Sequence, residues 1–384
     1  MMMKVDAIII GAGIAGSSTA IQLASLGHNT ILMDRQEFPR HKTCGEFMSP
    51  ETREMLEVLG VDLASSKIAY STMDRARIIL PHGGEIEAPL PGQAIGISRY
   101  ELDQILHRKA RAAGAEIVTK ATVTGIRKLD SHRYEVESRQ GDRLVRYETR
   151  TVIGAYGTKK PRGTVSATEG TRDETVYIGI KSHYSGINVP EQVELYFCNG
   201  GYIGISPIEE GKANVAALLT LDSVQGSGKS VPEILLAAAQ SNSRLAARLA
   251  EGIPVPDSQV SIAPLRLSDD PEPWSEFPHV GDAMLMIPPL CGDGMSIALR
   301  SALLCSGWTD IYLKGTLSYH QWQSGYTNEA NKEFSQLLKR ARLIQKLAFA
   351  RTNRLYPGLM RMFPGLAKYV VNATRLSERG WSAN

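Results

Sequence analysis

The sequence predicts an α/β fold in which a lobe built on a parallel sheet carries an inserted lobe of mixed β-sheet and is followed by a C-terminal helical segment. Three observations support this prediction. An apolar run, a glycine-rich turn and a helical pattern open the chain; a similar pattern returns at residues 280–302; and the stretch between them is mostly strand-like. A length of 384 residues with 43% hydrophobic and 22% charged residues is ordinary for two globular lobes, and it excludes a disordered, collagen-like or coiled-coil chain.

The chain opens with the pattern of a Rossmann-like βαβ unit. Residues 5–10 (VDAIII) are apolar and largely β-branched, which is typical of a buried parallel strand. Residues 17–25 have helical spacing, and a second apolar run at 29–33 ends at Asp34. Gly13 and Asp34 are 21 positions apart, close to the spacing that a dinucleotide-binding unit requires.

The glycines of the motif Gly11-x-Gly13-x-x-Gly16 each suit a step in nucleotide binding. Gly11 permits a tight turn, Gly13 lets the backbone approach a pyrophosphate, and Gly16 lets the helix pack closely on the strand. The N-terminus of the helix offers free N–H groups and a partial positive charge to the phosphates. Asp34 stands where an acid can hold ribose hydroxyls. These residues predict a nucleotide site, and a purely structural glycine-rich turn is the alternative.

The middle of the first lobe alternates between helix and strand. Residues 98–113 have apolar positions at helical spacing. Two patterned strands, 133–138 and 143–148, flank Gln140-Gly141-Asp142 and predict a hairpin. Residues 151–157 (TVIGAYG) form another apolar run that ends in a glycine, as a buried strand of the same lobe would.

The inserted lobe is predicted from residues 69–97 together with 174–266, which are mostly strand-like apart from one helix at 231–251. Residues 331–375 read as helices interrupted by Pro-Gly pairs. The expected boundaries place the first lobe at 1–68, 98–160 and 272–330, the inserted lobe at 69–97 and 161–271, and the helical segment at 331–384.

A second glycine cluster lies about 270 residues after the first. An acid after a glycine at the end of a strand, as in Gly281-Asp282, can bind ribityl or ribose hydroxyls. Gly292-x-Gly294, which opens the predicted helix 296–304, can point backbone N–H groups at a neighbouring ligand.

These motifs carry a resemblance to a known family. Gly11-x-Gly13-x-x-Gly16 with the distant Gly281-Asp282-Ala283 resembles the paired signature of the flavoprotein monooxygenase superfamily, which has the p-hydroxybenzoate-hydroxylase-like fold. Arg99, in S-R-Y-E-L-D, matches the arginine that such enzymes place against FAD. Residues 39–46 (PRHKTCGE) resemble the P-R-x-K-x-C-G loop of the geranylgeranyl-reductase-like branch, which includes flavin-dependent halogenases. The similarity runs over residues 5–307.

The resemblance implies a glutathione-reductase-type lobe that binds FAD, with NADPH or NADH as an electron donor. It implies catalytic contributions from Cys44 beside the flavin ring and from Gly292, Gly294 and Met295, where the helix start would stabilise the reduced anionic ring. A buried structural cysteine is the alternative for Cys44, and solvated loop charges are the alternative for Arg40 and Lys42. A redox pair of Cys44 with Cys291 is a further hypothesis. The cofactor residues that it implies are Gly11, Gly13, Ile14, Ala15, Gly16, Asp34, Arg35, Arg40, Lys42, Cys44, Gly45, Arg99, Val123, Gly157, Gly281, Asp282, Gly292, Gly294 and Met295.

Two departures from the family pattern bear on function. Tyr156-Gly157 stands where the superfamily usually has Asp-Gly, so a separate flavin or electron-donor reductase is an alternative to direct reduction by a nicotinamide. Residues 201–207 (GYIGISP) lack the tryptophan that the reductase branch carries in its aromatic strand, and no W-x-W of the tryptophan halogenases occurs.

The first hypothesis for function is an FAD-dependent monooxygenase that oxidises a hydrophobic aromatic, polyketide-like or lipid-tailed small molecule through a flavin C4a-hydroperoxide. The alternative is a geranylgeranyl-reductase-like ene-reductase of isoprenoid or lipid double bonds. Halogenation is a minor alternative, and a non-catalytic flavin module comes last.

Charge is concentrated at the C-terminal end. From residue 331 onward the chain has 11 Lys and Arg against two acids, Glu333 and Glu378. A solvated helical face is one explanation, and peripheral contact with an anionic membrane is the other. Nucleic-acid binding is not expected, because the aromatic residues there fall at apolar helical positions.

No run of about 18 apolar residues is present, and four cysteines form no disulfide framework, which favours a cytoplasmic protein. The tail resembles that of oxidoreductases of secondary metabolism found beside type III polyketide synthases.

Overall fold

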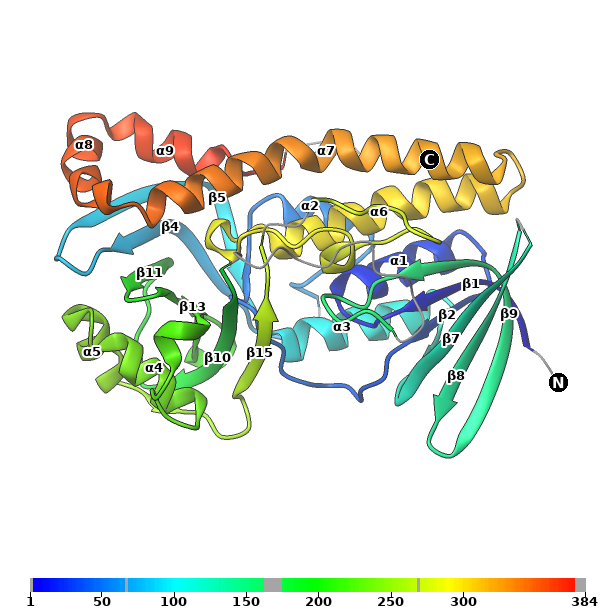
Figure 1. Ribbon diagram of the computed structural model, residues 1–384, viewed down its shortest axis with the longest axis horizontal. Coiled ribbons are helices and arrows are strands. Elements are labelled where there is room, and N and C mark those ends of the chain that lie inside the picture. The colour runs from blue at the N-terminus through cyan, green and yellow to red at the C-terminus, as the bar shows by residue number, and fades with distance from the viewer. Residues whose placement is uncertain (1–2, 66–67, 131, 162–174, 268–269, 377–384) are drawn as a thin grey trace.

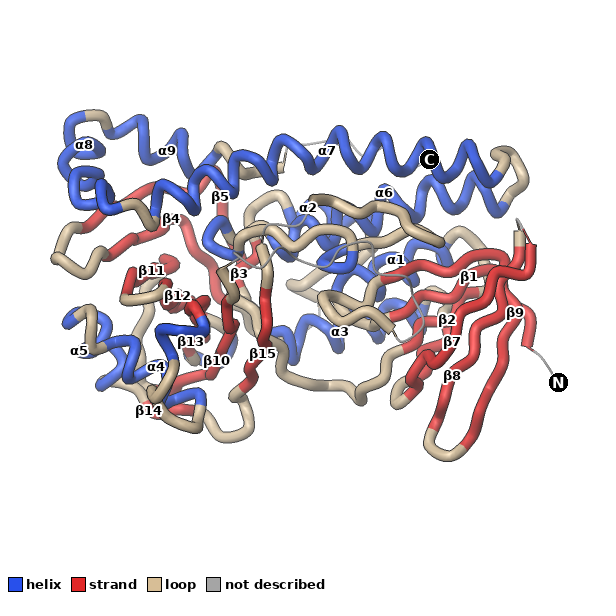
Figure 2. Tube along the Cα trace, in the orientation of Figure 1, coloured by secondary structure: helices blue, strands red, loops and turns tan. Residues whose placement is uncertain are grey.

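The computed structural model describes residues 3–65, 68–130, 132–161, 175–267 and 270–376 (Figure 1). Two separate sheets lie at opposite ends of the molecule, and helices α6 to α9 run along one long side over both (Figure 2). This arrangement confirms the predicted α/β fold with a mixed β-sheet lobe and a C-terminal helical segment.

The first sheet has six strands in the order β6-β2-β1-β9-β8-β7. β1 pairs in parallel with β2 on one side and β9 on the other, while β7, β8 and β9 are antiparallel. Ile8 and Ile9 are fully buried because β1 lies in the middle of this sheet. The predicted hairpin is confirmed, since Gln140 pairs with Arg143 across a two-residue turn. The strands are β1 (Met3–Ile10), β2 (Thr30–Met33), β6 (Glu116–Val118), β7 (Ala121–Asp130), β8 (Arg133–Gln140) and β9 (Arg143–Gly154).

Helix α1 packs on β1 and β2 of this sheet and contacts both α3 and α6, and α2 packs against α6. Gly16 allows α1 to start against the turn, because a Cβ there would lie 1.8 Å from the carbonyl oxygen of Gly11. Gly11 itself has a φ of +109° and faces the backbone of Ala155, so only glycine fits. The helices of this lobe are α1 (Ile14–Ser25), α2 (Thr52–Val58), α3 (Arg99–Ala112) and α6 (Gly294–Leu313).

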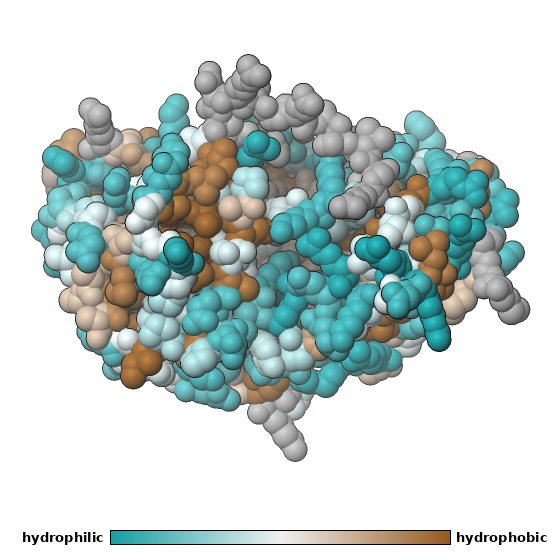
Figure 3. All heavy atoms as spheres, turned by 60° about the horizontal axis from the view of Figure 1, so that its bottom comes forward, coloured by the Kyte–Doolittle hydropathy of each residue, from teal (hydrophilic) through white to brown (hydrophobic). Residues whose placement is uncertain are grey.

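The second sheet has nine strands and is mixed. Strands β11 and β4 pair in parallel, and all other strand pairs of this sheet are antiparallel. Figure 3 shows the molecule with the bottom of Figure 1 turned toward the viewer. On this face, apolar surface gathers mainly on the left, over the half that holds the second sheet. The strands are β3 (Phe47–Met48), β4 (Ser71–Ile79), β5 (Glu85–Gly96), β10 (Tyr177–Ser185), β11 (Gln192–Cys198), β12 (Gly201–Pro207), β13 (Ala213–Thr220), β14 (Ile253–Pro254) and β15 (Val260–Leu265).

One face of the second sheet packs against two helices, α4 (Val231–Ala239) and α5 (Ser243–Ala250). The sequence predicts a single helix over 231–251, and this is wrong. Asn242 interrupts it, because its side chain accepts the backbone N–H of Leu245 as an N-cap and donates to the carbonyl oxygen of Phe197 at 2.9 Å.

The C-terminal helices begin earlier than the sequence suggests. α7 (Tyr319–Ala348) is continuous, so the boundary expected between residues 330 and 331 falls inside a helix. The basic residues that begin near residue 331 lie on the exposed side of this helix, so the change in charge does not mark a helix boundary. Beyond α7 come α8 (Tyr356–Met362) and α9 (Pro364–Asn372), which lie over β5 at the end of the molecule (Figure 1). Short 3₁₀ turns are η1 (Glu209–Gly211), η2 (Leu221–Val224), η3 (Gly281–Ala283), η4 (Pro289–Cys291) and η5 (Arg351–Leu355).

Candidate active site

A single cavity of about 1460 Å³ joins the two lobes. At one end it is bounded by the glycine motifs of the first lobe, and at the other by the second sheet and the C-terminal helices. Gly16 is the one predicted cofactor residue outside this lining, because its role is the close packing of α1. The predicted residues that line the cavity are Gly11, Gly13, Ile14, Ala15, Asp34, Arg35, Arg40, Lys42, Cys44, Gly45, Arg99, Val123, Gly157, Gly281, Asp282, Gly292, Gly294 and Met295.

The N-terminus of α1 forms an anion cradle. Its N-cap is Gly13, no side chain caps the first turn, and that turn contains no acid. A Cβ built on Gly13 would lie 3.4 Å from both Arg99 Nη2 and Lys42 Nζ, so two cations converge on the free N–H groups. Burial lowers the pKa of Lys42, with Arg99 acting in the same direction and Asp282 opposing it. The space, the two cations and the helix dipole together fit the pyrophosphate of a dinucleotide.

Asp34 is held in place at the end of β2 beside this cradle. Its Oδ2 accepts the Ala12 N–H at 2.9 Å and its Oδ1 accepts the Gln36 N–H at 2.8 Å. From the other side, His107 Nε2 lies 2.8 Å from the Ala12 carbonyl oxygen and fixes the same turn. His107 is a residue that the sequence did not single out, although it faces inward on a helix that the sequence predicts. Asp34 therefore presents a fixed carboxylate where ribose hydroxyls would lie.

The second glycine cluster comes against the first. Gly281 has a φ of +61°, and a Cβ there would lie 2.8 Å from the Cβ of Ala15. This close approach brings Asp282, the next residue, to the cavity wall. The two motifs, some 270 residues apart in the sequence, thus lie against each other at one end of the cavity.

The start of α6 also faces the cavity without a cap. Its N-cap residue is Asp293, whose side chain does not accept from the helix and instead pairs with Arg375 Nη1 at 2.6 Å. Burial raises the pKa of Asp293 to about 7, and Arg375 opposes that rise. Gly294 and Met295, the first two residues of α6, line the cavity, so the positive end of the helix dipole lies at the cavity wall.

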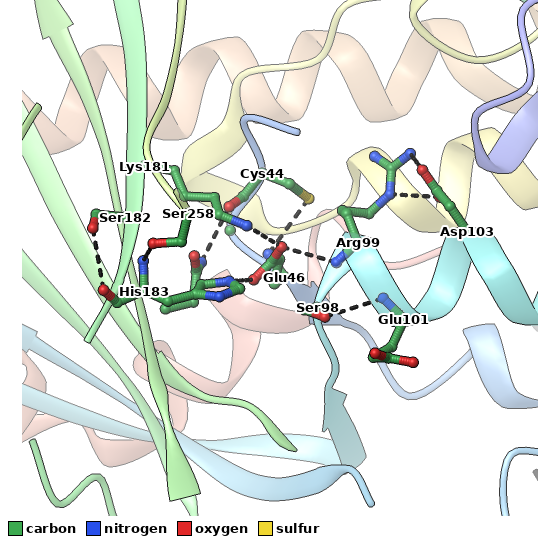
Figure 4. Close-up of polar contacts among 12 residues, drawn as sticks. Cys44, Glu46, Ser98, Arg99, Glu101, Asp103, Lys181, Ser182, His183 and Ser258 are labelled. Carbon is green, nitrogen blue, oxygen red and sulfur yellow. Dashed lines mark hydrogen bonds and ion pairs between the residues drawn. The ribbon is translucent and has the colours of Figure 1, made fainter. Parts of the chain in front are cut away.

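The loop that carries Cys44 is fastened to the second sheet (Figure 4). The Cys44 carbonyl accepts Asn214 Nδ2 at 3.1 Å, and the Gly45 carbonyl accepts Ser206 Oγ at 2.9 Å. The Cys44 Sγ accepts the backbone N–H of Glu46 at 3.4 Å. Burial raises the pKa of Cys44, which favours the neutral thiol over the thiolate.

A buried ionic cluster behind this loop was missed by the sequence analysis. The carboxylate of Glu46 accepts the backbone N–H of Arg99 at 2.8 Å and His183 Nε2 at 2.6 Å, and it pairs with Lys181 Nζ. Glu46 and Lys181 are fully buried. Burial acts to raise the pKa of Glu46, but Lys181 and His183 outweigh it, and the pKa is lowered. The one available signal is that Lys181 and His183 are polar residues two apart, on one face, in a strand-like run.

His41 adjoins this cluster. Its ring stacks on Tyr100 with centroids 5.0 Å apart and meets His183 edge-on at 5.0 Å. Burial, and then the charges of Lys181 and His183, lower the pKa of His41 to about 4, which keeps the imidazole neutral at neutral pH.

The remainder of the cavity is apolar. One wall is the face of the second sheet that α4 and α5 leave uncovered, and the other wall is made by the end of α7 with α8 and α9. Cys291 also lines the cavity, and burial raises its pKa to about 12. All four cysteines are unbonded in the structure, so the proposed pair of Cys44 with Cys291 is not a disulfide here. The apolar lining includes Ile78, Leu195, Phe197, Leu218, Ile262, Met360, Val370 and Val371.

Comparison with known proteins agrees with this geometry. Residues 4–219, more than half of the chain, match the FAD binding domain family FAD_binding_3. Digeranylgeranylglycerophospholipid reductase 2 of Methanopyrus kandleri is 25% identical over 374 residues, which cover 94% of this chain and 91% of the relative. The flavin-dependent brominase Bmp2 superposes with a TM-score of 0.79 at 18% identity, over 99% of this chain and 96% of the other. A geranylgeranyl bacteriochlorophyll reductase-like protein of Thermoplasma acidophilum has a TM-score of 0.76 at 20% identity, over 100% and 94% of the two chains.

The fold and the site thus define an FAD-dependent oxidoreductase. The chain belongs to the FAD_binding_3 family of FAD binding domains. The two solved structures, at their low identity, show a shared fold. The resemblance drawn from the glycine motifs and the Cys44 loop is confirmed at the level of this family and its neighbours.

Proposed function

We propose that this protein is an FAD-dependent ene-reductase, which reduces carbon–carbon double bonds in isoprenoid or other lipid-tailed substrates. The observation that carries the proposal is the single cavity, which runs from the glycine motifs past Cys44 into a long apolar chamber. An apolar tail can fill that chamber while a double bond lies at the flavin end. The relative from Methanopyrus kandleri is named a digeranylgeranylglycerophospholipid reductase, and its similarity to this chain extends over nearly its whole length, which supports the same reaction class.

FAD held at the glycine motifs, once reduced by NADPH, NADH or a separate reductase, would supply a hydride to one carbon of the double bond. The chain must then deliver a proton to the other carbon. The neutral Cys44 thiol, in the loop fastened to the second sheet, is our proposed donor, and its thiolate recovers a proton from solvent afterwards. The uncapped start of α6, at Gly294 and Met295, would stabilise negative charge beside the bound ring, and apolar side chains would pack around the substrate.

Oxygen transfer is the second candidate function, and it was the first hypothesis from the sequence. The apolar lining of the cavity and the uncapped start of α6 suit an oxygenase as well, since such an enzyme must keep its reduced flavin and substrate in an apolar environment while oxygen is transferred. The lack of tryptophan in β12, which holds Tyr202 and Ile203 instead, also favours this alternative over a reductase.

The test is turnover of the photoreduced, FAD-loaded protein with a geranylgeranyl-tailed lipid, with and without oxygen, followed by mass spectrometry of the product. A product that gains two hydrogen atoms per double bond without oxygen supports the ene-reductase. A product that gains an oxygen atom, and only in aerated buffer, overturns it in favour of the oxygenase. No change of the lipid under either condition contradicts both.

The role of Cys44 has its own test. Cys44→Ala is expected to lower the rate of double-bond reduction about 100-fold, while the flavin absorbance spectrum of the bound cofactor is retained. Cys198→Ala, which changes a buried cysteine of β11 that does not line the cavity, is the matched control and should react at the normal rate. Equal rates for both variants would remove Cys44 as the proton donor.

A further inference from the structure

The outward face of η5, α8 and α9 is unusually apolar for a protein surface. Leu355, Met362, Phe363 and Tyr369 are exposed at 71%, 74%, 57% and 71% of their surface. Leu355, Leu359 and Met362 follow the i, i+4, i+7 spacing of one helix face. The solvent side of a surface helix is normally polar, so large side chains gathered on that side indicate an interaction surface.

The inward face of the same helices forms part of the cavity wall. Tyr356, Met360, Leu366, Val370 and Val371 line the cavity. The helix pair lies over β5 at the end of the molecule (Figure 1), so it separates the apolar chamber from the outside by the thickness of one helix layer. A surface that binds something apolar outside is therefore next to the chamber that receives the substrate.

Cations surround the outward apolar face. Arg354, Arg361 and Lys368 are exposed, and none of the three forms an ion pair within the part of the chain that the structure describes. No Asp or Glu occurs from residue 334 to 377, so this segment has no carboxylate of its own. Apolar side chains with flanking basic residues on short helices match the chemistry of an interfacial, anionic membrane surface.

We propose that η5, α8 and α9 dock on the surface of an anionic bilayer, with the three cations at the lipid headgroups and Leu355, Met362 and Phe363 at the acyl boundary. Among the described residues no helix is long and apolar enough to cross a membrane, so the contact is peripheral. The docking itself does not depend on the reaction. Only its use, which is to place the chamber beside membrane-dissolved lipid-tailed substrates, rests on the proposed function.

Flotation of the purified, FAD-loaded protein with lipid vesicles tests this surface. The protein is expected to float with equimolar phosphatidylcholine and phosphatidylglycerol, to float less with phosphatidylcholine alone, and to be released by high salt. Arg361→Gln with Lys368→Gln should weaken binding to the anionic vesicles roughly 25-fold, about fivefold for each cation. Met362→Ser with Phe363→Ser should weaken binding to both kinds of vesicle about tenfold or more.

Ile253→Ser is the matched control, because Ile253 is exposed at 70% but lies in β14, away from these helices. Wild-type protein that stays unbound, or Ile253→Ser that reduces flotation as much as the other variants, overturns the proposal. Sedimentation showing a dimer that Met362→Ser with Phe363→Ser dissociates, without any flotation, would make a second copy the occupant and also overturn it. Flotation measures membrane binding without any turnover. A variant that does not float can therefore be assayed separately for reduction of detergent-dissolved lipid, so a failure of membrane docking is distinguished from a failure of the proposed function.

Discussion

The buried pair of Glu46 and Lys181 makes the sharpest prediction about how the site is held. The pair joins the Cys44 loop of the first lobe to β10 of the second sheet, and neither side chain has any exposed surface. Lys181→Met keeps most of the side chain's volume but removes the charge that balances Glu46. The carboxylate would then retain only the N–H of Arg99 and the ring of His183 as partners.

The expected loss follows from the cost of an uncompensated charge. Removing one member of a buried ion pair typically destabilises a protein by about 3–5 kcal/mol, because the remaining charge stays out of water. Glu46→Gln should cost a similar amount by stranding the ammonium of Lys181. The double variant Glu46→Gln with Lys181→Met strands neither charge, so its loss should fall short of the sum of the single losses by about 2 kcal/mol or more.

Urea unfolding of the FAD-loaded protein, followed by circular dichroism and by flavin absorbance, measures these differences. Lys212→Met, which breaks an ion pair of Lys212 with an exposed glutamate, is the control and should leave the unfolding midpoint unchanged. Additive losses in the double variant, or a midpoint unchanged by Lys181→Met, would refute the reasoning.

The same pair sets a dependence of stability on pH. The folded-state pKa of Glu46 is lowered below its ordinary value of 4.5, even though burial alone would raise it, because Lys181 and His183 favour the ionised form. Its contribution is therefore complete above pH 4.5 and is lost as the pH falls through the lowered pKa. Glu46→Gln should remove this part of the acid sensitivity, and an unchanged acid limb in the variant would contradict the assignment.

Three further predictions concern the cofactor site. Gly13→Val would place methyl groups between Arg99 and Lys42, so FAD affinity measured by fluorescence titration should fall about 100-fold, and normal affinity would exclude this site for the pyrophosphate. Asp34→Asn should weaken FAD about tenfold by losing a charged acceptor, and a calorimetric titration showing no change would remove its ribose role. Burial raises the folded-state pKa of Asp293 from 3.8 to about 7, so its contribution to stability is complete below pH 3.8 and is lost as the pH rises through 7. Asp293→Asn should make the melting temperature nearly independent of pH across that range. If the melting temperature of the variant still falls as the pH rises, another group causes the pH dependence.

The sequence alone determined the parts of the site that depend on local geometry. The glycine spacing of residues 11–16 and the acid at Asp34 are set within one βαβ unit, where backbone sterics leave few arrangements. The structure puts Gly13 at the N-cap of α1, and Asp34 bonds to the turn at Ala12, as that spacing predicts. The resemblance of residues 39–46 likewise identified the loop that passes the cavity, because its motif is a contiguous string.

Only the tertiary structure decided which distant residues meet. Glu46 and Lys181 are 135 positions apart, and their contact depends on how the second sheet docks on the first lobe. Asn242 is a local N-cap for α5, but its side chain is fixed by a bond to a carbonyl group of β11, a contact that only the fold supplies. The continuity of α7 through residue 331 and the two-faced character of α8 and α9 likewise follow from packing against α6 and β5. Local sterics act between neighbours in the sequence, whereas burial and charge pairing act between neighbours in space. The residues of the cofactor motifs could therefore be predicted from the sequence, and the contacts that form the walls of the chamber could not.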